Sequence, residues 1–86
     1  MRITNEAKEV ALNIAKSGTW GNGIGNERIN ERSIFPLSII FRNVTTEREV
    51  WFDRDTCGAH LRYIFYVDKG WIKFRSESDY SGKWRG

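Results

Sequence analysis

Three charged residues on two predicted strands have the types needed for acid–base cleavage of RNA. Glu49 could act as the base, His60 as the acid and Arg62 as the phosphate clamp, because side-chain alternation places all three on one face of a sheet. The ordinary alternative is ion pairing across hairpins. Glu49 would then face Arg42. Asp53 would likewise face His60. A small endoribonuclease is therefore one alternative, and a protein that is not an enzyme is favoured.

A single cysteine and a single histidine offer little for metal binding or nucleophilic catalysis. Cys57 and His60 form a Cys-x-x-His pair, whereas a zinc site needs three or four ligands and a nucleophilic thiol needs its base within hydrogen-bond reach. The glycines at 18, 21, 23 and 25 follow a predicted helix, while phosphate-binding loops follow a strand, and no Lys-Ser/Thr pair closes this loop. We expect no metal ion and no cofactor.

Aromatic and basic residues in the second half of the chain could instead bind a macromolecule. Trp, Tyr and Arg are the residue types most enriched at binding hot spots. The candidate partner-binding residues are Trp51, Arg62, Tyr66, Trp71, Lys73 and Arg75. Aromatic rings that stack on bases, next to cations that neutralise phosphates, would also suit single-stranded RNA or DNA. Acidic residues beside the same surface would repel phosphates, which favours a protein partner.

The first residues predict an amphipathic helix over about residues 5–17. Apolar residues recur at helical spacing in Ala7, Val10, Ala11 and Ile14. Thr4 suits the N-cap. Residues 18–33 show no sustained period and contain four glycines, so they are predicted to form a Gly-rich loop.

The period changes to two after residue 33, in four runs at 34–42, 48–53, 60–67 and 71–75. These runs predict a four-stranded antiparallel β-meander over residues 34–75, packed under the helix in an α+β fold. Three hairpin pairings set the register: Phe41 with Val50, Phe52 with Leu61, and Val67 with Ile72. A three-residue Asp-Lys-Gly loop would shift the last strand by one residue, so its register stays open.

The second face of this sheet combines apolar and charged residues, although a face in contact with water should be polar. On the predicted register it carries Ser38, Ile40, Arg42, Glu49, Trp51, Asp53, His60, Arg62, Ile64, Tyr66, Trp71, Lys73 and Arg75. The Gly-rich loop, the tail at 76–86, a second copy of the chain or a foreign partner could cover it. Tyr80 and Trp84 favour docking of the tail on its own domain.

The composition indicates one small domain over residues 1–86. Aromatic residues make up 14% of the chain and supply buried area for a single core. No apolar run approaches the roughly 20 residues that span a membrane, and the N-terminus lacks the apolar stretch of an export signal. A lone cysteine is typical of a reducing compartment. We expect a cytoplasmic protein without membrane association.

These patterns predict a non-catalytic binding protein, an inhibitor or adaptor of the kind that phages also encode. It would occupy the surface of a protein partner through the aromatic and basic sheet face. The alternatives are a single-stranded RNA- or DNA-binding domain and the endoribonuclease. The excess positive charge that would favour nucleic-acid binding lies in the last third of the chain. Residues 60–86 hold six Lys/Arg against three Asp/Glu, whereas residues 1–59 hold eight of each, for a net charge of +3. A homodimer through the same face is a further arrangement.

Overall fold

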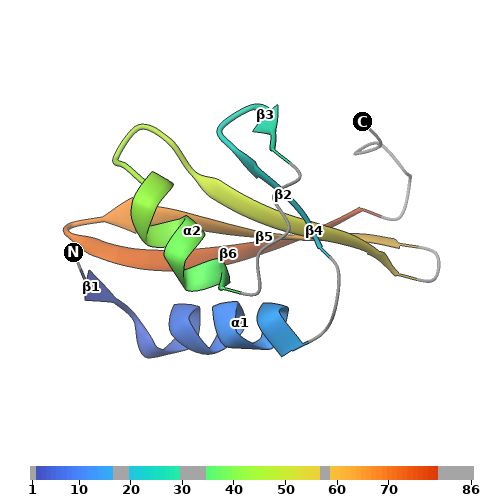
Figure 1. Ribbon diagram of the computed structural model, residues 1–86, viewed down its shortest axis with the longest axis horizontal. Coiled ribbons are helices and arrows are strands. Elements are labelled where there is room, and N and C mark those ends of the chain that lie inside the picture. The colour runs from blue at the N-terminus through green and yellow to red at the C-terminus, as the bar shows by residue number, and fades with distance from the viewer. Residues whose placement is uncertain (1, 17–19, 30–34, 57–58, 80–86) are drawn as a thin grey trace.

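Within the described residues, six strands form a sheet in the order β1-β6-β5-β4-β2-β3, and two helices cover it (Figure 1). This computed structural model describes residues 2–16, 20–29, 35–56 and 59–79. Its elements are β1 (Arg2–Ile3), α1 (Asn5–Lys16), β2 (Gly21–Ile24), β3 (Glu27–Arg28), α2 (Pro36–Asn43), β4 (Val50–Thr56), β5 (Ala59–Asp68) and β6 (Trp71–Asp79). The described part of the chain is therefore α+β, as predicted. The sheet is mixed, because β1 runs parallel to β6 while the other pairs are antiparallel.

The first helix forms where the apolar spacing places it. α1 buries Ala7, Ala11 and Ile14 against the sheet. Thr4 acts as its N-terminal cap, because the Thr4 hydroxyl accepts a hydrogen bond of 3.2 Å from the Ala7 amide. The helix was predicted to end at about residue 17, and it is described to Lys16.

The predicted strand at 34–42 is wrong, because residues 36–43 form α2. Pro36 stands in the first turn of this helix, where its missing N–H is not needed. Ile39 and Ile40 are both fully buried, which a helix achieves and a strand exposed on one face does not. The predicted pairing of Phe41 with Val50 therefore fails, and Phe41 is exposed on the helix surface. Ser38, Ile40 and Arg42 likewise leave the second sheet face for α2.

The Gly-rich segment supplies strands that the sequence pattern did not predict. β2 and β3 lie within residues 18–33, and β2 pairs with β4 so that Gly23 lies opposite Trp51. Gly25 has a φ of 60° in the tight turn between them, a conformation that glycine adopts without strain. Glycine has low β propensity, so these short strands carry no alternating signal.

The hairpin registers agree with the prediction in part. Val67 pairs with Ile72 as predicted, across a two-residue turn in which Lys69 and Gly70 both have positive φ. Phe52 pairs with Tyr63 and not with Leu61, a shift of two residues that keeps the same face. β6 continues to Asp79, so the predicted sheet limit at 75 is too short and residues 76–79 belong to the sheet. The prediction that Tyr80 and Trp84 dock lies outside the described residues.

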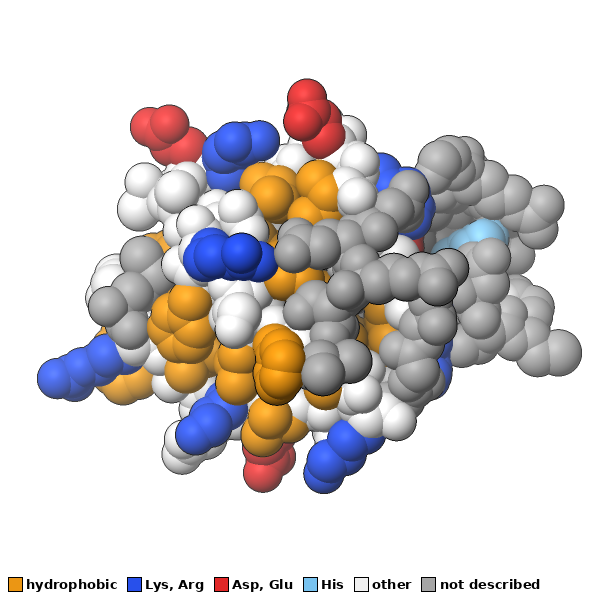
Figure 2. All heavy atoms as spheres, viewed as in Figure 1, with side chains coloured by type: hydrophobic (Ala, Val, Ile, Leu, Met, Phe, Trp, Pro, Cys, Tyr) orange, Lys and Arg blue, Asp and Glu red, His pale blue; other side chains and the backbone are white. Residues whose placement is uncertain are grey.

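The hydrophobic core lies between the helices and one face of β4, β5 and β6. Its buried members are Ala7, Ala11, Ile14, Ile39, Ile40, Val44, Val50, Phe52, Phe65 and Ile72. Hydrophobic side chains also gather on the surface where α1 and α2 lie (Figure 2), and Leu12, Phe35 and Phe41 are exposed there. The opposite face of the long strands is called the open face below. It carries Glu49, Trp51, Asp53, His60, Arg62, Ile64, Tyr66, Asp68, Trp71, Lys73, Arg75 and Glu77.

Candidate interaction surface

The strand register brings all six predicted partner-binding residues to the open face. Trp51 lies opposite Ile64, which lies opposite Arg75 on the next strand. Tyr66 lies opposite Lys73, and Trp71 begins the same strand. Arg62 lies opposite Asp53 on β4. These side chains therefore form one surface, although they differ widely in how far they reach solvent.

Trp51 is the buried centre of this surface, with 7% of its area exposed. Its ring lies across Gly23, where a Cβ would overlap the indole, and its Nε1 donates a hydrogen bond of 2.9 Å to the Gly25 carbonyl. The guanidinium carbon of Arg62 stands 4.1 Å from the ring centroid, and that of Arg28 stands 5.1 Å away. Such stacked cations add cation–π attraction and cover the ring from water.

Asp53 holds both of these arginines in place. Its Oδ2 accepts hydrogen bonds from Arg62 Nη2 at 2.9 Å and from Arg28 Nη2 at 3.1 Å. The Asp53 side chain is only 13% exposed, so solvent screens these ion pairs less than pairs at the surface. We call Trp51, Gly23, Arg28, Asp53 and Arg62 the Trp51 cluster. It is a second, smaller packed cluster in the middle of the open face.

The accessible residues of the open face carry paired charges. Arg75 donates to Glu49 Oε2 at 2.6 Å, and about 44% of each side chain is exposed. This bond raises the pKa of Arg75. Lys73 Nζ donates to Asp68 Oδ2 at 2.8 Å. Tyr66 lies beside these pairs, with the Arg75 guanidinium carbon 5.6 Å from its ring centroid. Trp71 is 39% exposed at the end of the face.

The hydrogen bond from Lys73 lowers the pKa of Asp68 below its ordinary value of 3.8. Because the pKa in the folded state is depressed, the pair stabilises the fold above pH 3.8, and this contribution is lost as the pH falls through the lower folded value. We expect Lys73→Met to bring the pKa of Asp68 back to about its ordinary value, measured by NMR titration of the side-chain carboxyl carbon. An unchanged pKa in this variant would show that the pair does not form in solution.

The catalytic trio proposed from the sequence is not brought together. Glu49 precedes Val50, whereas His60 pairs with Asp55, so six strand positions of about 3.4 Å each place them roughly 20 Å apart. A general acid and a general base that act on one phosphate must both reach it directly or through one water. Glu49 is instead bonded to Arg75, and Arg62 is bonded to Asp53. The predicted pairings of these carboxylates are also replaced: Arg42 lies in α2 while Glu49 bonds Arg75, and Asp53 lies opposite Arg62 in place of His60.

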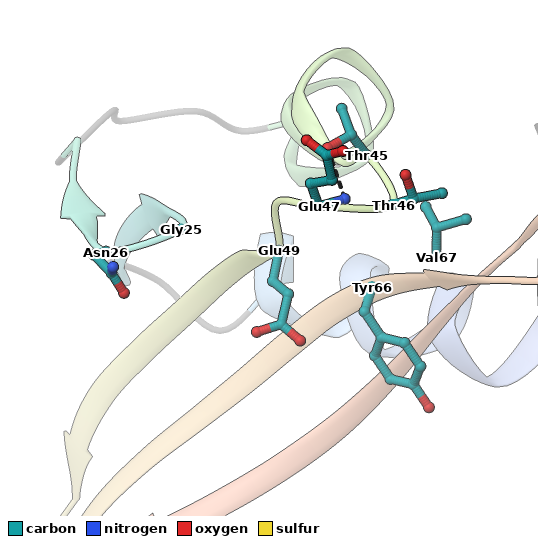
Figure 3. A pocket seen from close by; sticks show the side chains of 8 residues that line it. All are labelled: Gly25, Asn26, Thr45, Thr46, Glu47, Glu49, Tyr66 and Val67. Atoms are coloured by element: carbon teal, nitrogen blue, oxygen red, sulfur yellow. Dashed lines mark hydrogen bonds between the residues drawn. The ribbon is translucent and has the colours of Figure 1, made fainter.

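A hollow of about 360 Å³ lies at one rim of the open face, between the β2–β3 turn and the segment that joins α2 to β4. Its lining residues are Gly25, Asn26, Thr45, Thr46, Glu47, Glu49, Tyr66 and Val67 (Figure 3). The side chains of Asn26, Glu49 and Tyr66 point to one side, whereas those of Thr45 and Glu47 lie on the other (Figure 3). Because its polar groups do not converge on one point, the hollow lacks the geometry typical of a small-molecule site.

Within the described ranges there is neither a cluster of metal-ligating residues nor a helix that could span a membrane. No three His, Cys, Asp or Glu residues gather there as a metal site would require, and Cys57 lies outside those ranges. Neither described helix has the length and apolar character needed to cross a bilayer.

Sequence reasoning missed two parts of this surface. Arg28 lies within the predicted Gly-rich loop at 18–33, because β3 has no alternating pattern, yet it contacts both Trp51 and Asp53. Asp68 was assigned only to a turn, although an acidic residue two positions from Tyr66 on the same strand belongs to the same face and could have been included.

Scans against protein-family models, curated proteins and solved structures each find no significant match.

Proposed function

We propose that this protein is a non-catalytic binding protein, an inhibitor or adaptor, that occupies the surface of a protein partner through the accessible part of its open face. The accessible contact residues are Tyr66, Trp71, Lys73 and Arg75, and the Trp51 cluster, which includes Arg62, is the more buried part of the same face beside them.

The pairing of charge on this face is the observation that carries the proposal. Lys73 contacts Asp68, and Arg75 contacts Glu49 at hydrogen-bond distance. Asp53 neutralises Arg62 in the same way. A nucleic acid backbone presents only negative charge, and its binding depends on cations that are free to replace counterions. A protein surface presents both signs, so alternating pairs can match it and fix its orientation.

Aromatic rings between these charged pairs supply the affinity that the proposal needs. Tyr66 is half-buried and Trp71 is 39% exposed, so each keeps a rigid apolar surface available at small entropic cost. A rim of charged pairs around such anchors is the usual anatomy of a protein interface.

A capture experiment with matched variants tests this proposal. The wild-type chain, a Tyr66→Ala/Trp71→Ala variant and a Leu12→Ala control are used as baits, since Leu12 is exposed to a similar degree on the helix side (42%). We expect the double variant to bind the captured protein at least about tenfold more weakly, because two hot-spot truncations remove more than about 1.4 kcal/mol of binding free energy. The control should bind normally. A protein retained by the double variant, or lost with Leu12→Ala, would contradict the assignment.

Titration with single-stranded RNA and DNA, followed by tryptophan fluorescence, distinguishes a protein partner from a single-stranded nucleic acid. With a protein partner we expect no saturable quenching at low salt. Saturable quenching that weakens steeply with salt would place bases on the open face and replace the protein partner by a nucleic acid.

A further inference from the structure

Among the described residues, the outer edge of β6 has a pairing strand over only a short part of its length. β1 pairs only with Trp71 and Ile72, because the chain turns into α1 after Thr4. Along residues 73–79, no described strand pairs with this edge. We call residues 73–79 the free edge. Unpaired edges of this length are templates for another strand unless something blocks them.

The backbone groups that face outward can be assigned from the pairing with β1. The Ile72 carbonyl accepts a hydrogen bond from the Thr4 amide, so the backbone amide and carbonyl of Ile72 face away from β5. Because the direction alternates along a strand, the amide and carbonyl groups of Phe74, Ser76 and Ser78 also face outward. Ser76 and Ser78 are exposed, so this backbone is accessible to a partner strand.

The charges along the free edge are arranged with opposite signs on the two sides of its centre. Residues 73–79 have the sequence Lys-Phe-Arg-Ser-Glu-Ser-Asp, with Ser76 in the middle. On the open face two cations therefore precede Ser76 and two acidic positions follow it. Such a strand is complementary to itself when a second copy runs antiparallel to it.

We propose that two copies of this chain pair through their free edges, antiparallel and centred on Ser76, to form a continuous twelve-stranded sheet. Ser76 would lie opposite Ser76 of the partner subunit, and Phe74 opposite Ser78 of the partner subunit. These are the outward-facing positions, so each such pair exchanges two backbone hydrogen bonds. A two-fold axis through this centre makes the contact isologous and closed.

The same register pairs unlike charges. Arg75 lies opposite Glu77 of the partner subunit, at positions without backbone hydrogen bonds, where facing side chains come closest. Lys73 lies opposite position 79, an aspartate in the sequence. Centring the pairing on residue 75 or 77 would instead oppose two arginines or two glutamates. The charge pattern and the midpoint of the free edge thus both indicate Ser76 as the centre of the pairing.

The ion pairs within one chain leave room for these contacts. Glu77 Oε1 lies 3.6 Å from Arg75 Nε, which is beyond hydrogen-bond distance, and the Glu77 side chain is 43% exposed. Arg75 has five N–H donors, so it can keep Glu49 and add a carboxylate from the second copy. The two open faces lie on the same side of the joined sheet, which would make the proposed interaction surface bivalent.

Sedimentation equilibrium of the full chain, from micromolar to millimolar concentration, tests the dimer. We expect weak, concentration-dependent association that decreases with salt, as is typical of contacts that bury less than about 1,200 Å². On the unmodified protein, exchange of the Phe74, Ser76 and Ser78 amide hydrogens should slow as the concentration rises. A monomer at every concentration would overturn the proposal.

Two variants with matched controls test the register. Ser76→Pro removes an outward amide and leaves the β5 ladder intact, so it should abolish the dimer while the monomer stays folded, whereas Ser76→Ala should dimerise normally. Glu77→Gln should weaken the dimer at least about threefold, since the two-fold axis repeats the lost pair, and Glu47→Gln, at an exposed loop position, should not. A dimer that is insensitive to Ser76→Pro and Glu77→Gln would show that it forms elsewhere. These results do not depend on the foreign partner, so the two proposals can fail separately.

Discussion

Replacing Trp51 by alanine is expected to lower the free energy of unfolding by about 3–5 kcal/mol, the usual cost of truncating a buried tryptophan. The indole is 7% exposed, lies on Gly23 and donates a hydrogen bond to the Gly25 carbonyl. Its removal leaves a cavity, because Gly23 offers no side chain to fill the space. It also leaves Arg28 and Arg62 without the ring on which they stack.

Urea unfolding of the variant and of a matched tryptophan variant measures this effect. Trp71→Ala is the control, since Trp71 lies on the same face but is 39% exposed. We expect this control to cost less than about 1 kcal/mol. Equal losses in the two variants would show that Trp51 is not buried in solution.

The contrast between the two tryptophans marks the limit of what alternation can predict. The period of two placed Trp51 and Trp71 on one face, and the structure agrees. Alternation states which way a side chain points and does not state what covers it. The cover of Trp51 comes from Arg28, on a strand without a periodic signal, and from Arg62 on the neighbouring strand.

The error at α2 has a different physical cause. Phe35, Leu37, Ile39 and Phe41 alternate as in a half-buried strand, but short apolar runs do not distinguish a strand from a buried helix. Pro36 is compatible with an edge strand, but the first turn of a helix tolerates proline equally well. The exposure of Phe35 and Phe41 shows that the alternating set is not the buried set.

The sequence predicted which residues lie on the open face. It did not predict which of them form ion pairs with each other. Membership of the open face followed from β4, β5 and β6, whose alternation is strong. The ion pairs could not be predicted in this way. A shift of two residues in the β4–β5 hairpin keeps each side chain on the same face but changes the residue opposite it. Asp53 therefore meets Arg62 and not His60, and the trio required for acid–base chemistry is dispersed along the strands.

Replacing Asp53 by asparagine is expected to cost about 2–3 kcal/mol of unfolding free energy, because one carboxylate serves two arginines in a partly buried position. Asparagine keeps the size of the side chain and removes its charge, so the guanidinium groups of Arg28 and Arg62 would repel each other beside the Trp51 ring.

The matched control is Asp68→Asn, which breaks the Lys73 pair where 44% of the Asp68 side chain is exposed. Exposed pairs contribute little because solvent screens them, so the control should lose much less stability in the same urea titration. If both variants lose the same amount, Asp53 does not organise the Trp51 cluster. If Asp53→Asn alone is costly, the stacking of Arg28 and Arg62 on the Trp51 ring depends on this one carboxylate.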